Sequence, residues 1–210
     1  MSESFDAADF FARARAKLRQ GWPDDAFDPE SLLRHGDHRL SGLPQAPGGR
    51  PAAVLAPIVL REDGPYVLLT QRSSALRDHS GQVAFPGGKI EPGEKPLAAA
   101  LREAEEEIGL ARDRVEILGC LDPYQTSTGF RVFPVVGLTR PPVELTLDTS
   151  EVEDVFETPL SFLMNPVNHE KHSRVWQGKE RFFYAMPWQG RYIWGATAGM
   201  IHNLYDRLYG

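Results

Sequence analysis

Acidic residues are concentrated in one short segment of the chain, from Glu94 to Glu107. On a helix, residues three and four apart share a face, so Glu103, Glu106 and Glu107 should present their carboxylates toward one point while Glu105 points elsewhere. Like charges this close repel each other, and a bound hard cation such as Mg²⁺ or Mn²⁺ would relieve the repulsion. A solvated acidic helix face has the same spacing, so the spacing alone leaves both interpretations open.

The residues around these glutamates follow a longer pattern. The chain has Gly88, then Glu94, then the continuous run Arg102-Glu103-Ala104-Glu105-Glu106-Glu107-Ile108-Gly109-Leu110. This resembles the signature of the Nudix hydrolase family: Gly, five residues, Glu, seven residues, Arg-Glu, an aliphatic, any residue, Glu-Glu, any residue, Gly and an aliphatic. Every fixed position matches, and Ala104 is a small aliphatic where the family usually has Ile, Leu or Val.

The resemblance implies a Nudix-like α/β/α sandwich of the α/β (α+β) class, with a mixed central sheet and a loop-helix-loop metal site. It implies metal-dependent hydrolysis of a nucleoside diphosphate linked to another group, with Mg²⁺ or Mn²⁺ as cofactor. The metal would neutralise the polyanionic diphosphate and polarise the attacking water.

The family's roles carry over to matching positions of this chain. The resemblance makes Glu103 and Glu107 metal ligands, Glu106 a ligand or the catalytic base, and Arg102 a residue that orients a nearby carboxylate. Glu94 would contact metal through water or support the structure. A carboxylate from a later loop often completes such sites, and Glu151 or Glu153 could do so here, although both also fit solvated turn residues.

A second motif precedes the first. Leu68-Leu69-Thr70, Arg72-Ser73, Arg77, Gly81 and Phe85-Pro86-Gly87-Gly88 resemble the motif found before the signature in the coenzyme A pyrophosphatase branch of the family. That branch splits coenzyme A into 3′,5′-ADP and 4′-phosphopantetheine. The planar guanidinium group of arginine binds phosphate with two hydrogen bonds, and glycines let a ligand approach the backbone closely. We therefore expect substrate contacts from Arg72, Arg77, Gly81, Phe85, Gly87 and Gly88.

Other interpretations stay open at this point. A Nudix pyrophosphatase for ADP-ribose, NADH or dinucleoside polyphosphates would carry the same signature, and a Nudix module that binds nucleotides without cleaving them is an alternative of another class. Selectivity for coenzyme A should lie in a basic contact to its 3′-phosphate. His79 fits an acid/base or a plain hydrogen-bonding residue. Trp176, Trp188 and Trp194 fit base stacking or packing.

The elements that must position these residues can be predicted from periodicity and turn signals. Alanines favour a helix over 96–108, and Gly109 should end it. Apolar and β-branched runs predict strands, and the helical spacing of Ala7, Phe10, Phe11 and Ala14 predicts an amphipathic N-terminal helix. The expected strands are 53–60, 66–72, 115–121, 131–138 and 152–158. We also expect a short helix over 159–164, a hairpin that joins 181–186 to 191–194, and a last helix over 196–208.

Composition limits the class of protein. The 210 residues carry a net charge of −6 and are 41% hydrophobic, which is typical of a globular domain and not of a nucleic-acid coat. We expect residues 1–45 to form a helical appendage and residues 46–210 the Nudix hydrolase domain. Cys120 is the only cysteine, so a cytoplasmic protein without disulfides is expected. We expect a small nucleotide substrate, coenzyme A, and no nucleic-acid partner. We expect no secretory signal and no membrane-spanning segment. A homodimer is a possible oligomeric state.

Overall fold

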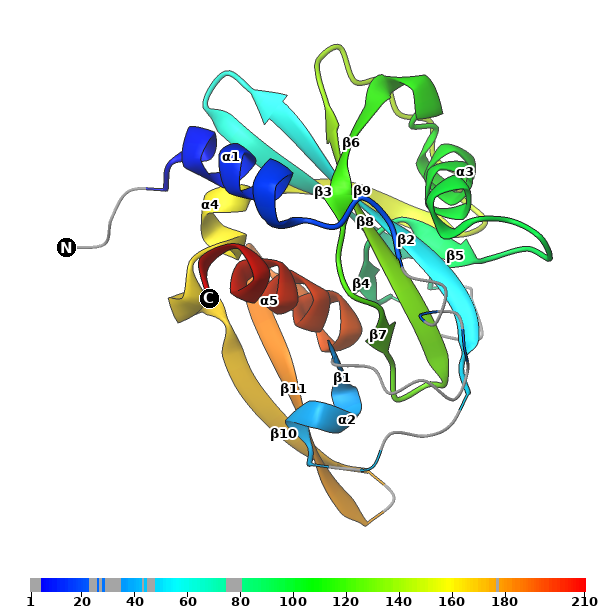
Figure 1. Cartoon of the computed structure of the whole chain (residues 1–210), viewed down its shortest axis with the longest axis vertical. Helices are drawn as coiled ribbons and strands as arrows, with labels where there is room; N and C mark the ends of the chain where they lie inside the picture. Colours follow the sequence, from blue (N-terminus) through cyan, green and yellow to red (C-terminus); the bar gives the residue numbers. More distant parts are fainter. Residues whose placement is uncertain are drawn as a thin grey trace.

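The structure is a computed structural model that describes residues 5–22, 26, 28, 35–42, 44, 48–74, 81–176 and 178–210 (Figure 1). Its centre is strand β2 (Arg50–Arg61), which pairs parallel with β8 (Phe130–Thr139) and antiparallel with β3 (Gly64–Arg72). Both pairing directions therefore occur in one sheet, so the predicted mixed central sheet is confirmed.

Shorter strands extend this sheet at several places. The path through it runs β1-β7-β8-β2-β3-β4, while β5 pairs with β2, β6 with β8 and β9 with β3. The bounds of these strands are β1 His35–Gly36, β4 Val83–Ala84, β5 Gly87–Lys89, β6 Val115–Cys120, β7 Tyr124–Gln125 and β9 Val152–Pro159.

The sheet is covered by helices on both faces. Helix α3 (Pro96–Ile108) lies on one face, and α1 (Ala7–Lys17) and α5 (Gly195–Tyr209) lie on the other (Figure 1). Side chains alternate between the faces of a strand, so β2 sends Leu55 toward α3 and Ile58 toward the other cluster. The expected α/β/α sandwich is confirmed by these two buried clusters.

A second sheet contains β10 (Glu170–Trp176), β11 (Lys179–Trp188) and β12 (Arg191–Trp194), and α5 packs against β11. The hairpin between β11 and β12 was expected, and β10 was not. Strand β10 has no apolar alternation for sequence analysis to detect, because most of its residues are polar and exposed to solvent.

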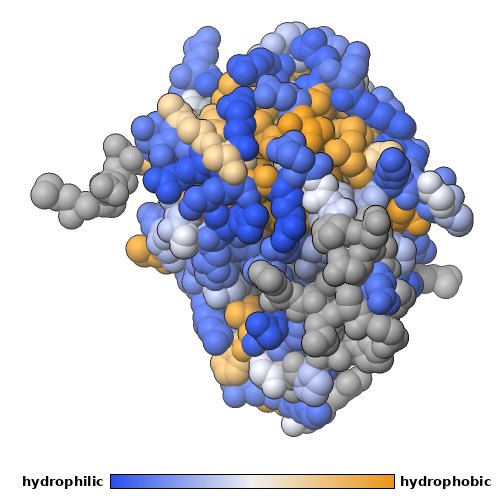
Figure 2. Space-filling view, viewed as in Figure 1, coloured by the Kyte–Doolittle hydropathy of each residue, from blue (hydrophilic) through white to orange (hydrophobic). Residues whose placement is uncertain are grey.

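The other short elements agree with the sequence or lie in loops. The expected helix over 159–164 is α4 (Leu160–Leu163), and short 3₁₀ turns occupy Arg112–Arg114 and Pro166–Asn168. No helix among the described residues is long and apolar enough to cross a bilayer. In the space-filling view most of the visible face is hydrophilic, with hydrophobic residues gathered in its upper part (Figure 2).

The N-terminal segment packs onto the rest of the chain. The Asp6 side chain accepts hydrogen bonds from Ala8 N and Asp9 N, which caps α1. Phe10 and Ala14 are buried, and α1 contacts α5. Further along, α2 (Asp37–Leu40) contacts α5 and β11. The domain boundary at residue 45 stays a prediction.

Candidate active site

Helix α3 presents the glutamates, and its limits follow from its sequence. Pro96 occupies the first turn, where its missing N–H costs nothing. Gly109 ends the helix with φ 70°, and its N–H donates to the carbonyls of Ala104 and Glu105. Ala104 is fully buried in the cluster against β2, which fixes the rotation of the helix. The predicted helix is thereby confirmed from its first residue to its last.

Arg102 joins three carboxylates of the signature. Its Nε and Nη2 donate to the two oxygens of Glu94, both at 2.9 Å. Its Nη1 donates to Glu103 Oε1 and to Glu106 Oε2, both at 2.9 Å. These hydrogen bonds, the one to Glu94 first, raise the pKa of Arg102 and lower that of Glu94. The resemblance implied that Arg102 orients a nearby carboxylate, and in the structure its guanidinium donates to three of them.

Glu107 lies deeper, with only 3% of its side chain exposed. Its Oε2 accepts a hydrogen bond from Gly87 N at 3.0 Å, and its Oε1 accepts one from Arg72 Nη1 at 3.3 Å. Burial raises the pKa of Glu107 to about 7, and the charges of Glu103 and Glu151 act in the same direction. The Gly87 N–H and Arg72 oppose this shift. The Glu107 carboxylate can therefore bind either a proton or a cation.

Gly87 and Gly88, where the signature begins, allow this close approach. Gly87 has φ 155°, and a Cβ there would lie 2.4 Å from the carbonyl oxygen of Ala53. A Cβ on Gly88 would lie 2.5 Å from the carboxyl carbon of Glu103. Any side chain at either position would displace strand β2 or the Glu103 carboxylate, so only glycine keeps β5 and α3 this close.

The structure distinguishes the two later acids. The negative charge of Glu151 contributes to the raised pKa of both Glu103 and Glu107, so Glu151 lies near these two carboxylates. Glu153 accepts instead from Ser74 N at 3.3 Å. Of the two residues that could complete the site, Glu151 is therefore the one placed beside it.

The donor set suits a hard cation. Four carboxylates, those of Glu103, Glu106, Glu107 and Glu151, come from one helix face and one loop, and oxygen ligands of this type favour Mg²⁺ or Mn²⁺. Within the part of the chain that the structure describes, no three acidic, histidine or cysteine side chains converge closely enough to hold a metal ion as they stand. Arg102 occupies one oxygen each of Glu103 and Glu106, so binding a cation there requires these side chains to turn.

The residues of the upstream motif have different surroundings. Arg72 faces Glu107, so it belongs to the carboxylate cluster, and its contact with substrate phosphate stays a prediction. Gly81 has φ 66°, and its N–H donates to the Arg72 carbonyl at 3.1 Å. Phe85 is 5% exposed and packs in the core. Arg77 and His79 lie outside the described residues.

The remaining candidates are the tryptophans and Cys120, and those described lie either in packed regions or at a cavity. Trp188 packs on Phe162, with ring centroids 4.5 Å apart. Trp194, Val54 and Phe85 line a cavity of about 240 Å³. The side chain of Trp176 lies outside the described part of the structure. Cys120 is buried, as expected of an inert small hydrophobe, and burial raises the pKa of its thiol to about 11.

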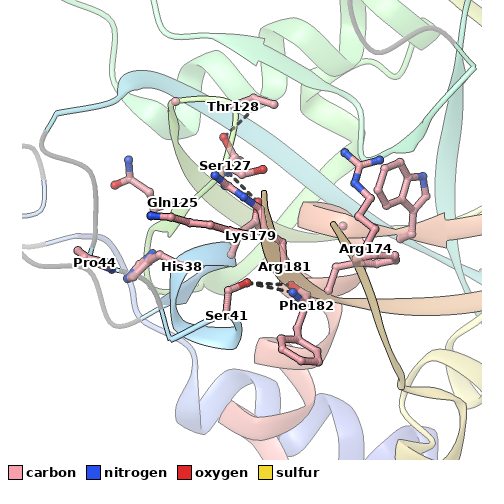
Figure 3. Close-up of a pocket in the computed structure, with 16 residues that line it drawn as sticks. His38, Ser41, Pro44, Gln125, Ser127, Thr128, Arg174, Lys179, Arg181 and Phe182 are labelled. Carbon is pink, nitrogen blue, oxygen red and sulfur yellow. Dashed lines mark hydrogen bonds between the residues drawn. The ribbon is translucent and has the colours of Figure 1, made fainter. Parts of the chain in front are cut away.

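Sequence analysis missed a group of residues around a larger, adjoining cavity of about 410 Å³ (Figure 3). Its walls come from α2, from the turn between β7 and β8, and from β10 and β11, which are far apart in the sequence. The one available signal was the group of cations at Arg174, Lys179 and Arg181.

The comparisons with known proteins identify the family. The NUDIX domain matches residues 49–189. A protein of Klebsiella pneumoniae subsp. pneumoniae called "Uncharacterized Nudix hydrolase NudL" is 43% identical over 182 residues, covering 86% of this chain and 92% of that protein. One of the same name from Photorhabdus laumondii is 43% identical over 160 residues, covering 76% and 85%. The chain belongs to the Nudix hydrolase family.

Two solved structures are similar to part of this chain. A Caenorhabditis elegans Ap4A hydrolase in a binary complex has a TM-score of 0.47 and is 23% identical, covering 52% of this chain and 80% of that chain. A MutT/nudix family protein from Enterococcus faecalis has a TM-score of 0.49 and is 18% identical, covering 79% and 64%. The assignment to the family rests on the sequence matches.

Proposed function

We propose that this Nudix hydrolase cleaves the diphosphate bond of coenzyme A, and of its derivatives, to give 3′,5′-ADP and 4′-phosphopantetheine. One observation carries the proposal. Two residues of the upstream motif, Arg72 and Gly87, both donate hydrogen bonds to Glu107 of the signature. The segment that resembles the coenzyme A pyrophosphatase branch is therefore bound directly to the carboxylate cluster, where a diphosphate would have to lie.

The metal is proposed to be held by Glu103, Glu106 and Glu107. When bound, Mg²⁺ or Mn²⁺ would neutralise the diphosphate and lower the pKa of the attacking water. The Gly87 N–H holds the Glu107 carboxylate in place. Arg102 holds Glu94 with two hydrogen bonds and so keeps the loop against the helix. In this scheme the proton of the attacking water passes to Glu106, which is 57% exposed and reachable from the substrate side, or Glu106 serves as a ligand.

The proposed partner is therefore a small nucleotide, and the proposed location is the cytoplasm. The buried Cys120 is the only cysteine of the chain, which fits a protein that needs no intramolecular disulfide.

A substrate panel tests the proposal. Purified protein with Mg²⁺ is offered coenzyme A, ADP-ribose and NADH separately, and kcat/KM is measured for each, with a chelator control. We expect coenzyme A to have the highest kcat/KM by about tenfold or more, since it alone of the three carries the 3′-phosphate for which a selective basic contact is expected. A higher kcat/KM for ADP-ribose or NADH would reject the substrate but not the family. No cleavage of any of the three would favour a nucleotide-binding module.

A further inference from the structure

A cationic cavity adjoins the smaller cavity that Val54 and Phe85 line. Figure 3 labels, among the residues that line the cationic cavity, Arg174 of β10, Lys179 and Arg181 of β11, and Ser127 from the turn between β7 and β8. The cavity, of about 410 Å³, is large enough for a phosphorylated sugar.

The hairpin gathers positive charge on one face. Arg174 and Arg181 are direct cross-strand partners, and Lys179 follows the same face two residues from Arg181. Like charges directly opposite each other destabilise a β-hairpin. The carboxylate between the two β11 cations points to the other face, where Glu180 accepts a hydrogen bond from Ser173 Oγ at 2.7 Å. One face of the hairpin therefore places three cations at the cavity, with no acidic residue between them on that face.

Two of these cations have no counter-ion among the described residues. Neither Lys179 nor Arg181 forms an ion pair with any carboxylate that the structure describes. The Nε of Arg181 is buried and has no hydrogen-bond partner among the described residues. A buried guanidinium N–H without an acceptor is costly, so an anion that accepts from it would be stabilising.

The cavity also contains one acid, which is already engaged. The Asp37 carboxylate accepts hydrogen bonds from the Tyr124 hydroxyl and the Ser127 N–H, both at 2.7 Å. Its charge is thus held at the turn, across from the hairpin. Trp194 forms a flat apolar wall, with the Arg174 guanidinium 5.3 Å from its ring centre.

The cavity is continuous with the segment that supports Glu107. The adjoining cavity of about 240 Å³ shares Ser127, Arg174 and Trp194 with it and is also lined by Val54. Val54 pairs with Gly87, whose N–H donates to Glu107. The smaller cavity therefore borders the strand pair that supports Glu107.

We propose that Lys179 and Arg181, together with Arg174, bind the phosphomonoester on the ribose of the substrate, which in coenzyme A is the 3′-phosphate. The inference rests on the proposed function and adds the residues that set its selectivity. A phosphomonoester carries about −1.5 to −2 charges and three acceptor oxygens at neutral pH, which matches two guanidinium forks and one ammonium group. Inorganic phosphate has the same chemistry, so the experiment must separate the two sources.

The kinetic arm compares coenzyme A with dephospho-coenzyme A, which lacks only the 3′-phosphate. Arg181→Gln and Lys179→Gln should each lower kcat/KM for coenzyme A by about tenfold or more, and change that for dephospho-coenzyme A by less than about twofold. The matched control is Lys171→Gln, since Lys171 lies on the opposite face of the same hairpin, over the Phe182 ring. Equal losses on both substrates, or no loss on coenzyme A, would overturn the assignment.

The binding arm needs no hydrolysis. Calorimetric titration of the wild-type protein with 3′,5′-ADP, 5′-AMP and inorganic phosphate should show the tightest binding for 3′,5′-ADP, and Arg181→Gln should remove that advantage. This result would support the cavity assignment even if coenzyme A were not cleaved, so failure of the proposed function can be recognised separately. If inorganic phosphate bound as tightly as 3′,5′-ADP, or if 5′-AMP bound as tightly, the ribose-phosphate assignment would be rejected.

Discussion

The Gly87 N–H donates a hydrogen bond to the Glu107 carboxylate across 3.0 Å. This contact joins the loop before the Nudix signature to the last glutamate of the signature, twenty residues further along the chain. Because Gly87 is also paired with Val54 of β2, the position of Glu107 is set by the central sheet as well as by its own helix.

Replacing Glu107 should separate activity from folding. Glu107→Gln keeps the shape of the side chain but removes the charge that would bind metal, so turnover should fall by about 10²-fold or more. Circular dichroism should show an intact fold. The matched control is Glu105→Gln on the same helix, because Glu105 pairs with Arg112 away from the cluster. Normal turnover in folded Glu107→Gln would reject Glu107 as a metal ligand.

Arg102 should be irreplaceable by lysine. Arg102→Lys keeps the charge but cannot form the two parallel hydrogen bonds to Glu94 while also contacting Glu103 and Glu106. We expect kcat to fall by about tenfold and the Mg²⁺ concentration for half-maximal activity to change. Arg112→Lys, at an exposed pair on the same side of the protein, serves as the control. Equal activity of the two variants would show that the Arg102 network does not matter.

Gly88 should not tolerate even a methyl group. In Gly88→Ala the new Cβ would meet the Glu103 carboxylate at 2.5 Å, so the carboxylate must move out of the cluster. Activity should fall by about tenfold or more while the melting temperature changes little, since the carboxylate is the end of a flexible side chain. Gly21→Ala, where a Cβ meets nothing within 4 Å, is the control. Full activity in Gly88→Ala would mean that the position of Glu103 is not critical.

The metal-free protein should lose stability as the pH rises. Burial raises the pKa of Glu107 from 4.5 to about 7, so the folded state holds a proton that the unfolded state releases between these values. The contribution of Glu107 is therefore fully present below about pH 4.5 and declines until about pH 7, by on the order of 2–3 kcal/mol. Urea unfolding in chelator should show this decline in the wild type relative to Glu107→Gln. Parallel pH profiles of the two proteins would contradict it.

Local signals predicted the central helix well. Pro96 and Gly109 mark its two ends, and the alanines between them are both good helix formers and small enough to pack against β2. The strands around it were predicted from apolar runs, since most of their residues are buried. Their observed ends differ from the predicted ones by a few residues, as expected for strand termini.

Long-range contacts could not be predicted in this way. The pairing of β5 with β2 places Gly88 against Glu103, and nothing in the sequence near Gly88 indicates that strand. Arg102 reaches from within α3 to Glu94, just before the start of the helix, and the separation of eight residues is not one of the helical spacings of three or four. The cationic cavity combines three segments far apart in the chain, of which β10 lacks any apolar pattern.

The most direct test of the account is a product analysis with coenzyme A. Wild-type protein and Glu107→Gln are incubated with coenzyme A and Mg²⁺, with and without chelator, and the products are separated by liquid chromatography and identified by mass spectrometry. We expect 3′,5′-ADP and 4′-phosphopantetheine in equal amounts, formed only by the wild type and only with the metal. Intact coenzyme A in every sample, or cleavage at a bond other than the diphosphate, would contradict it.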